Sequence, residues 1–208
     1  MEAELIDYLM QINFEHEIKR IFKYYGYKYF KEGDYNLNIF GVRDSDLEPN
    51  VFNDVIGVSY NERCVHKLNL YRATTDCGLD YMINPVNVGG AAFVQEGQYE
   101  GLWKIGYHYN ILAFVQKANI ACYRDNNRNE IIDLDPKSVT TGNFYGINLH
   151  PCWTVETADK VGKWSAGCQV TKKRKDFGEL LDLGLKQSKI INSFTYTLFS
   201  RKQIEEAI

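Results

Sequence analysis

The chain has 208 residues, of which 45% are hydrophobic and 14% aromatic, and its formal net charge is −3. This length predicts one domain, or one domain with a small appendage, and supplies enough apolar residues for a core. The lack of a basic excess argues against a nucleic-acid partner, and no apolar run approaches the length of a membrane span.

The N-terminal stretch predicts one helix over residues 3–24, because apolar residues recur there at helical spacing. The aromatic segment 24–35 then leads into the domain and packs on it. We therefore expect residues 1–35 to form an N-terminal helical extension. This extension is either an outer layer of the domain or a docking element.

From residue 36 the pattern changes to the alternation typical of strands, bounded by Asp, Asn, Pro and Gly. Short turns such as 96–100 and 107–110 indicate a meander of hairpins. The predicted strands are 36–43, 54–60, 66–73, 91–95, 101–108, 111–116, 119–124, 145–149 and 168–171.

The C-terminal part predicts a helix over 173–189, a last strand over 193–200 and a short helix over 201–208. Residues 36–208 are therefore expected to form a mainly β (α+β) domain with one late packed helix.

The five cysteines include no CxxC pair, and the acidic N-terminus lacks the basic region of a secretory signal. We expect reduced thiols in a protein made in the cytoplasm without a signal peptide. A reversible disulfide between Cys152 and Cys168 stays open as an alternative.

Cys168 is the strongest candidate nucleophile. A cysteine attacks as thiolate, and a nearby histidine is the best base for it near neutral pH. His150 ends one predicted strand, and Cys168 begins another after the 14-residue excursion 151–164. Such strand ends can lie side by side, and the amides around Gly167 and Cys168 can form an oxyanion hole. The alternative is a buried cysteine and a surface histidine.

The pattern His150, 14 residues, then Ser165-x-Gly167-Cys168 resembles the signature of L,D-transpeptidase catalytic domains, which have the YkuD-like fold. In that family a His precedes Ser/Thr-His-Gly-Cys at similar spacing, and Ala166 stands here at the position of the second His. The resemblance implies a YkuD-like β-sandwich or meander. It also implies that Cys168 is the nucleophile and His150 the base, while Ser165 and the Gly167 backbone shape the site. Members form an acyl-enzyme on peptidoglycan stem peptides and transfer the acyl group to an amine or to water.

Three further aromatic residues lie near this motif in sequence or can reach it. Trp153 and Trp164 flank the motif, and they either bind substrate beside a groove or pack in the core. His108 lies at a predicted hairpin turn. It either replaces the missing histidine in space or is an ordinary surface histidine, and we expect the second.

A run of oxygen-bearing side chains follows positions 1, 3, 5 and 9 of an EF-hand loop: Asp125, Asn127, Asn129 and Asp133. However, the turn glycine is replaced by Glu130, and Pro136 stands at the twelfth position. We expect a metal-free Asx-rich turn, with calcium binding as the alternative. No metal and no cofactor are expected elsewhere.

Peptidoglycan lies outside the cytoplasm, so a wall-active domain without an export signal needs another carrier. Segments 35–43, 52–60 and 71–76 resemble the N-terminal part of phage-encoded proteins that carry this type of domain. We therefore expect a virion location, with peptidoglycan peptides and, through the helix over 3–24, other virion proteins as partners. Neither nucleic acid nor membrane is expected as a partner.

Three functions remain open from the sequence. The first is a cysteine enzyme that cross-links or trims stem peptides. The second is a non-catalytic virion structural protein that retains the fold for assembly. The third is a module that binds wall peptides without turnover.

Overall fold

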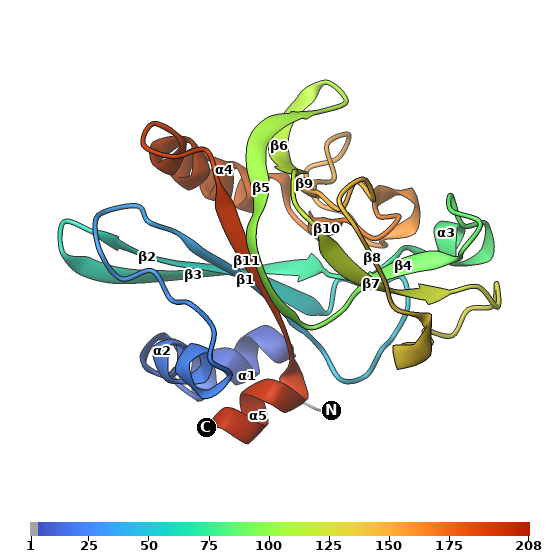
Figure 1. The fold of residues 1–208 in the computed structure, drawn as a ribbon, viewed down its shortest axis with the longest axis horizontal. Coiled ribbons are helices and arrows are strands. Elements are labelled where there is room, and N and C mark those ends of the chain that lie inside the picture. The colour runs from blue at the N-terminus through green and yellow to red at the C-terminus, as the bar shows by residue number, and fades with distance from the viewer. Residues whose placement is uncertain (1–3) are drawn as a thin grey trace.

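The protein is mostly β-sheet with five α-helices, and the computed structural model describes residues 4–208 (Figure 1). Within these residues the structure contains no candidate membrane-spanning helix. The elements in chain order are α1 (Leu5–Gln11), α2 (Phe14–Tyr24), β1 (Asn38–Arg43), β2 (Asp54–Glu62), β3 (Val65–Thr74), α3 (Leu79–Ile83), β4 (Ala91–Val94), β5 (Gly97–His108), β6 (Ile111–Gln116), β7 (Ile120–Asp125), η1 (Pro136–Ser138), β8 (Thr140–Gly142), β9 (Leu149–Pro151), η2 (Gly162–Trp164), β10 (Gln169–Thr171), α4 (Arg174–Ser188), β11 (Phe194–Ser200) and α5 (Arg201–Ala207). The mainly β (α+β) class is confirmed, as are the late helix and the last strand.

Eight strands close into a barrel, and three others form a separate small sheet. The order around the barrel is β1-β11-β5-β6-β9-β10-β3-β2, and the small sheet has the order β4-β7-β8. Hairpins join β2 to β3 and β5 to β6, as the predicted meander requires. In contrast, β9 and β10 are parallel, so the long segment between them returns the chain to the end of the barrel at which β9 began.

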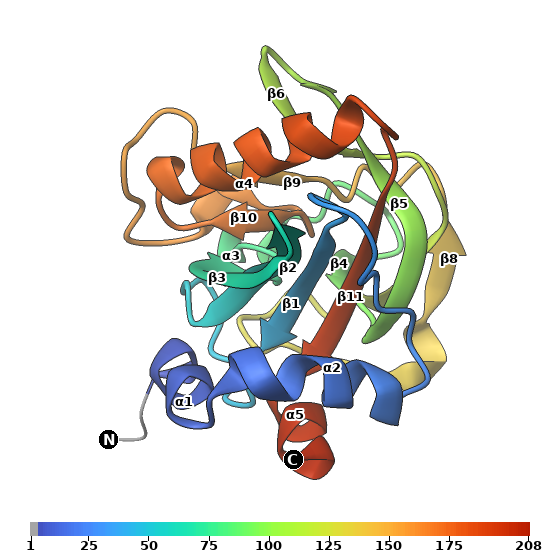
Figure 2. The ribbon, with the colours of Figure 1, turned by 90° about the vertical axis from the view of Figure 1, so that its left-hand side faces the viewer.

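The barrel strands are buried on both faces where a helical layer covers them. All six residues of β1 are buried. Ile39 points into the barrel core, whereas Phe40 and Val42 belong to a second apolar cluster with residues of α1, α2 and α5. This alternation is the period of two that a pleated strand imposes. Figure 2 shows these three helices on one side of the strands and α4 on the other.

The N-terminal segment forms two helices rather than the predicted single one. The break lies at Asn13, which has left-handed backbone angles (φ 55°, ψ 49°). Asn tolerates this conformation better than most residues. The break lets Leu9 of α1 and Phe14 of α2 both bury their side chains in the cluster beneath the helices. A helical period in the sequence does not reveal such a change of axis.

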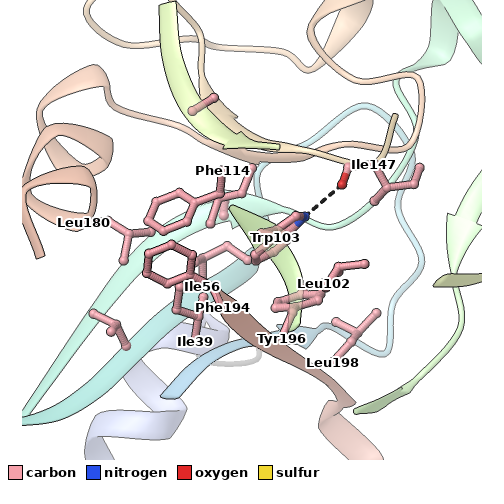
Figure 3. Close-up of a cluster of buried hydrophobic side chains, with 14 of the residues drawn as sticks. Ile39, Ile56, Leu102, Trp103, Phe114, Ile147, Leu180, Phe194, Tyr196 and Leu198 are labelled. Carbon is pink, nitrogen blue, oxygen red and sulfur yellow. Dashed lines mark hydrogen bonds between the residues drawn. The ribbon is translucent and has the colours of Figure 1, made fainter. Parts of the chain in front are cut away.

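The barrel core is centred on aromatic side chains (Figure 3). Trp103 is fully buried, and its indole Nε1 donates a hydrogen bond to the carbonyl oxygen of Ile147 at 2.8 Å. Its ring lies 4.5 Å from that of Tyr196, centroid to centroid. Leu180 of α4 packs into the same cluster. The hydrogen bond from Trp103 fixes the 145–148 segment directly before β9.

Two sequence predictions in this region were wrong. Residues 145–148 are a loop, and only Leu149 of the predicted strand belongs to a strand, β9. Residues 97–100 of the predicted turn 96–100 are instead part of the long strand β5. Gly101 has φ +59° beside a register shift between β5 and β11, so a bulge bends the strand where we expected it to begin. Helix α3 and strand β8 were not predicted.

Candidate active site

Cys168 and His150 lie on the same face of two neighbouring parallel strands. His150 is the middle residue of β9 and pairs with Val170 of β10, and Cys168 directly precedes β10. Residues two apart on a strand share a face, so the side chains of Cys168, Val170 and His150 project the same way. Their neighbours Leu149 and Gln169 face the barrel interior, where the hydroxyl of Tyr196 donates to Gln169 Oε1 at 2.6 Å. The predicted juxtaposition of the strand ends is therefore present on the outer face of the barrel.

The thiol of Cys168 contacts backbone rather than the imidazole. Its Sγ donates to the carbonyl oxygen of Gly146 at 3.2 Å and accepts a hydrogen bond from the Asn148 amide at 3.5 Å. Within residues 4–208 no hydrogen bond joins Sγ to His150. Cys168 is 8% exposed, and this burial raises the pKa of its thiol to about 11, against a smaller opposing effect of the Asn148 amide. At neutral pH the group is a thiol.

His150 is buried and held by the residue that follows it. Its Nδ1 lies 3.0 Å from the carbonyl oxygen of Pro151. A carbonyl only accepts, so Nδ1 carries the proton, and Nε2 keeps the lone pair with which it can take another. Burial lowers the pKa of His150 to about 4, partly offset by this hydrogen bond. The imidazole is therefore neutral at pH 7 and in the tautomer that a general base needs.

His108 packs against His150, contrary to the expectation of an ordinary surface histidine. Its ring stacks on that of His150 with centroids 4.7 Å apart. Its Nδ1 lies 3.0 Å from Asn148 Nδ2, which donates to it. Burial lowers the pKa of His108, so this ring too favours the neutral form. The sequence held no signal for this contact, because His108 ends β5 and reaches His150 only through the strand order of the barrel.

The two tryptophans form one aromatic wall with the histidines. Trp153 lies 5.1 Å from the ring of His150 and 5.6 Å from that of His108. Trp164 packs edge-on against Trp153 at 5.2 Å. Both tryptophans are half-buried. They therefore pack against the histidines of the candidate site while part of each ring stays exposed.

Ser165 holds the backbone around the cysteine. The residue is fully buried, and its hydroxyl lies 2.7 Å from the carbonyl oxygen of Asp76 and 2.8 Å from that of Cys168. The same hydroxyl accepts a hydrogen bond from the Gly167 amide at 3.1 Å. These contacts hold the backbone of residues 165–168 against that of Asp76. The Gly167 amide is occupied, however, so the predicted oxyanion hole does not include it in this arrangement.

Gly167 occupies a position that admits no larger residue without strain. Its φ is +120°, and a Cβ there would lie 2.9 Å from the carbonyl oxygen of Ala92. The preceding Ala166, in the position of the family's second histidine, is exposed and lines a pocket of about 220 Å³. Gly167 therefore packs against Ala92 of β4, whereas Ala166 faces the pocket.

A buried cluster of charged groups supports this stretch from within the fold, and sequence reasoning missed it. The guanidinium of Arg43 donates from Nε to Asp76 Oδ1 and from Nη1 to Glu96 Oε1, both at 2.8 Å. The Arg43 side chain is only 2% exposed. The backbone carbonyl of Asp76 accepts a hydrogen bond from the Ser165 hydroxyl. The charged cluster therefore fixes the backbone group to which Ser165 binds. Buried charges are retained when they are paired in this way.

The acidic loop after β7 forms Asx turns. Asp125 accepts hydrogen bonds from the amides of Asn127 and Asp133, at 3.3 and 3.2 Å. Asn129 accepts one from the Ile131 amide at 2.8 Å. Among residues 4–208, no group of three or more His, Cys, Asp or Glu side chains is placed to hold a metal ion. The loop's side-chain oxygens serve its own backbone amides.

The arrangement has the components of thiol acyl chemistry: a thiol, a neutral imidazole with a fixed tautomer, and aromatic walls. Each of the five cysteines is a free thiol, and Cys152 and Cys168 belong to the same buried cluster. Comparisons of the chain with protein-family models, with curated proteins and with solved structures found no match.

Proposed function

We propose that the chain is an L,D-transpeptidase-like cysteine acyltransferase with a YkuD-like domain, and that it acts on peptidoglycan stem peptides. The observation that carries this proposal is the placement of Cys168 and His150 on one face of adjacent parallel strands, with His150 Nδ1 hydrogen-bonded to Pro151. The spacing from His150 to Ser165-x-Gly167-Cys168 supports it. The resemblance of segments 35–43, 52–60 and 71–76 to phage-encoded proteins supports a virion location.

In the proposed reaction the thiol leaves the Gly146 carbonyl and turns toward His150. The sulfur attacks a peptide carbonyl carbon, and the thiol proton passes to His150 Nε2, giving a tetrahedral intermediate. His150 then returns this proton to the leaving amine as the carbon–nitrogen bond breaks. The resulting thioester is attacked by an acceptor amine or by water, whose proton takes the same route and finally restores the thiol.

The electrostatics of the site determine when the proton moves. Burial raises the pKa of Cys168 to about 11 and lowers that of His150 to about 4. The neutral pair is therefore the resting state, and a preformed thiolate–imidazolium pair is not. Proton transfer accompanies attack on the bound substrate, as in nucleophiles that rely on an adjacent general base.

The test is covalent labelling followed by product analysis. The protein is incubated with a carbapenem and, separately, with muropeptides that carry tetrapeptide stems. We expect an adduct on Cys168 and changed muropeptides with the wild type and with Cys152→Ala, a control that removes another buried thiol of the same cluster. With Cys168→Ala we expect neither. If the wild type forms no adduct and leaves muropeptides unchanged, the enzyme proposal fails.

A non-catalytic virion structural protein is the second candidate. It is favoured by the thiol's hydrogen bond to Gly146 in place of His150, and by Ala166 where the family has a histidine. In that case many copies would assemble in a symmetric array, which sedimentation and electron microscopy would detect. A soluble monomer that turns over stem peptides would contradict it.

A further inference from the structure

A pocket of about 220 Å³ is lined by residues that lie close to Cys168 in the chain or contact the segments around it. Ala166 lines the pocket, and so do Phe144 and Tyr145, which directly precede the Gly146 carbonyl that holds the thiol. The segment that contacts Sγ and the segment that carries Cys168 therefore both continue into the pocket wall. A group bound in the pocket would be adjacent to the reacting sulfur.

Arg124 of β7 is the cationic residue of this pocket. It pairs across the small sheet with Ala92, whose carbonyl lies closest to the Cβ position of Gly167. The Arg124 guanidinium carbon lies 4.3 Å from the centre of the Tyr145 ring, and Nε donates to Thr140 Oγ1 at 3.0 Å. The side chain is thus held in place from two sides.

The charge of Arg124 is uncompensated within the described chain. Among residues 4–208, no carboxylate lies within ion-pair distance of its guanidinium. Arg43, the other arginine near the site, is saturated by Asp76 and Glu96. A guanidinium presents a planar set of donors that matches a carboxylate. Arg124 therefore retains the capacity to bind an external anion.

The rim of the pocket is apolar and exposed. Phe144 is 93% exposed and Val86 77% exposed, and each projects from a loop that also lines the pocket. Exposed apolar side chains around a polar pocket are typical of a binding site for a chain that is part apolar and part charged. A peptide with an acidic branch has this chemistry.

We infer that this pocket is a subsite for a carboxylate of the acyl-donor peptide, which Arg124 binds while Phe144 and Val86 contact the peptide chain. This inference rests on the proposed function, since it names the substrate feature recognised beside Cys168. The substrate class is an acidic peptide whose carboxylate lies on the residue before the one that is acylated. The subsite selects the donor and places its carbonyl at the sulfur.

The test measures binding without turnover, in the Cys168→Ala variant. The probes are two N-acetylated stem tetrapeptides, L-Ala-γ-D-Glu-L-Lys-D-Ala and the same peptide with the glutamate α-carboxylate converted to a carboxamide. NMR titration gives both dissociation constants. We expect the carboxylate form to bind about tenfold more tightly, the size of one charge-assisted hydrogen-bond pair.

Three further variants, each combined with Cys168→Ala, test whether Arg124 causes the tighter binding of the carboxylate peptide. Arg124→Gln should abolish it, whereas Arg124→Lys should keep part of it, because the charge remains without the planar fork. Arg128→Gln removes the same charge from an exposed residue of the next loop and should leave the preference intact. Equal binding of the two peptides, or a preference that survives Arg124→Gln, overturns the inference.

The inference and the proposed function fail separately. If the wild type acylates on Cys168 but both peptides bind equally, the enzyme stands and the subsite is wrong. If the Arg124-dependent preference is present and Cys168 never acylates, the pocket is a carboxylate site and the catalytic proposal is wrong.

Discussion

The imidazole of His108 stacks on that of His150, with ring centroids 4.7 Å apart and an angle of 23° between the ring planes. Trp153 packs against both rings. Water is thereby kept from His150, whose pKa is lowered to about 4, chiefly by burial and to a lesser degree by the charge of His108. The stack sets the pH range in which His150 can accept a proton.

Replacing His108 with alanine should raise the pKa of His150. The substitution admits water to one face of the ring and removes an imidazole whose protonation opposes that of His150, so we expect an increase of about one unit toward the ordinary value of about 6.5. An NMR pH titration of the His150 ring protons measures this shift. His16→Ala, at an exposed position of α2, is the control and should leave the titration unchanged. An unaltered His150 pKa in His108→Ala would show that the stack does not control it.

The burial of His150 should make stability depend on pH. Between about 4 and the unfolded value of 6.5, the unfolded chain binds a proton that the native imidazole does not, so unfolding becomes easier as the pH falls. The full effect is about 3 kcal/mol in the free energy of unfolding. Urea unfolding of the wild type and of His150→Gln at about pH 7 and about pH 4.5 measures it. The variant should lose less stability on acidification than the wild type.

The buried carboxyl of Asp54 makes the free energy of unfolding depend on pH in the opposite direction. For this reason the test compares the wild type with His150→Gln. Burial raises the pKa of Asp54 to about 7, so its native state holds a proton that the unfolded state releases above about 3.8. Its contribution is present below that value and is lost as the pH rises through about 7. Because Asp54 is intact in both proteins, its effect cancels. An identical pH dependence in both would contradict the burial of His150.

Adding a methyl group at Gly167 should destabilise the protein. The residue has φ +120°, and the new Cβ would approach the Ala92 carbonyl to 2.9 Å. We expect Gly167→Ala to lower the free energy of unfolding by about 1–3 kcal/mol. Gly178→Ala is the matched control in α4, where nothing lies within 4 Å, and it should raise stability by about 0.5–1 kcal/mol. Chemical unfolding of both variants decides; equal effects would mean that Gly167 is not constrained.

The resting thiol of Cys168 should react slowly at neutral pH. Its pKa is raised to about 11, so alkylation by iodoacetamide should accelerate about tenfold per pH unit between about pH 7 and 10. Peptide mapping by mass spectrometry follows Cys168 separately from the exposed Cys64. His150→Gln should leave this rate unchanged, because the thiol donates to Gly146 rather than to the imidazole. A rate that is already maximal at neutral pH would indicate a preformed thiolate.

Removing the charge of Arg43 should be strongly destabilising. Arg43→Met leaves the buried carboxylate of Asp76 and the partly buried one of Glu96 without their cation, and breaking such a network costs about 3–5 kcal/mol. Arg20→Met is the control, since its ion pair with Glu17 is exposed on α2 and contributes at most about 1 kcal/mol. Urea unfolding compares the two. Similar losses would show that the Arg43 cluster is not a stabilising element.

The local elements followed from the sequence because their signals are local. The alternation that predicted β6 over 111–116 and the helical period that predicted α4 over 173–189 report how one segment contacts its surroundings. The order His150, Ser165, Gly167, Cys168 likewise depends on one loop between two strands. The helix break at Asn13 was not predicted. Asn tolerates left-handed backbone angles, but its presence in a sequence does not require them.

The tertiary structure alone decided which distant residues surround Cys168. His108 lies 42 positions before His150. It reaches His150 because it ends β5, whose hairpin partner β6 is the barrel neighbour of β9. Arg124 reaches the Ala166 pocket because β7 pairs with β4, and Arg43 meets Asp76 and Glu96 across the fold. Strand order and register set these contacts, and both follow from packing energy summed over the whole barrel. The sequence determined the candidate nucleophile and base, and the barrel determined their protonation and their neighbours.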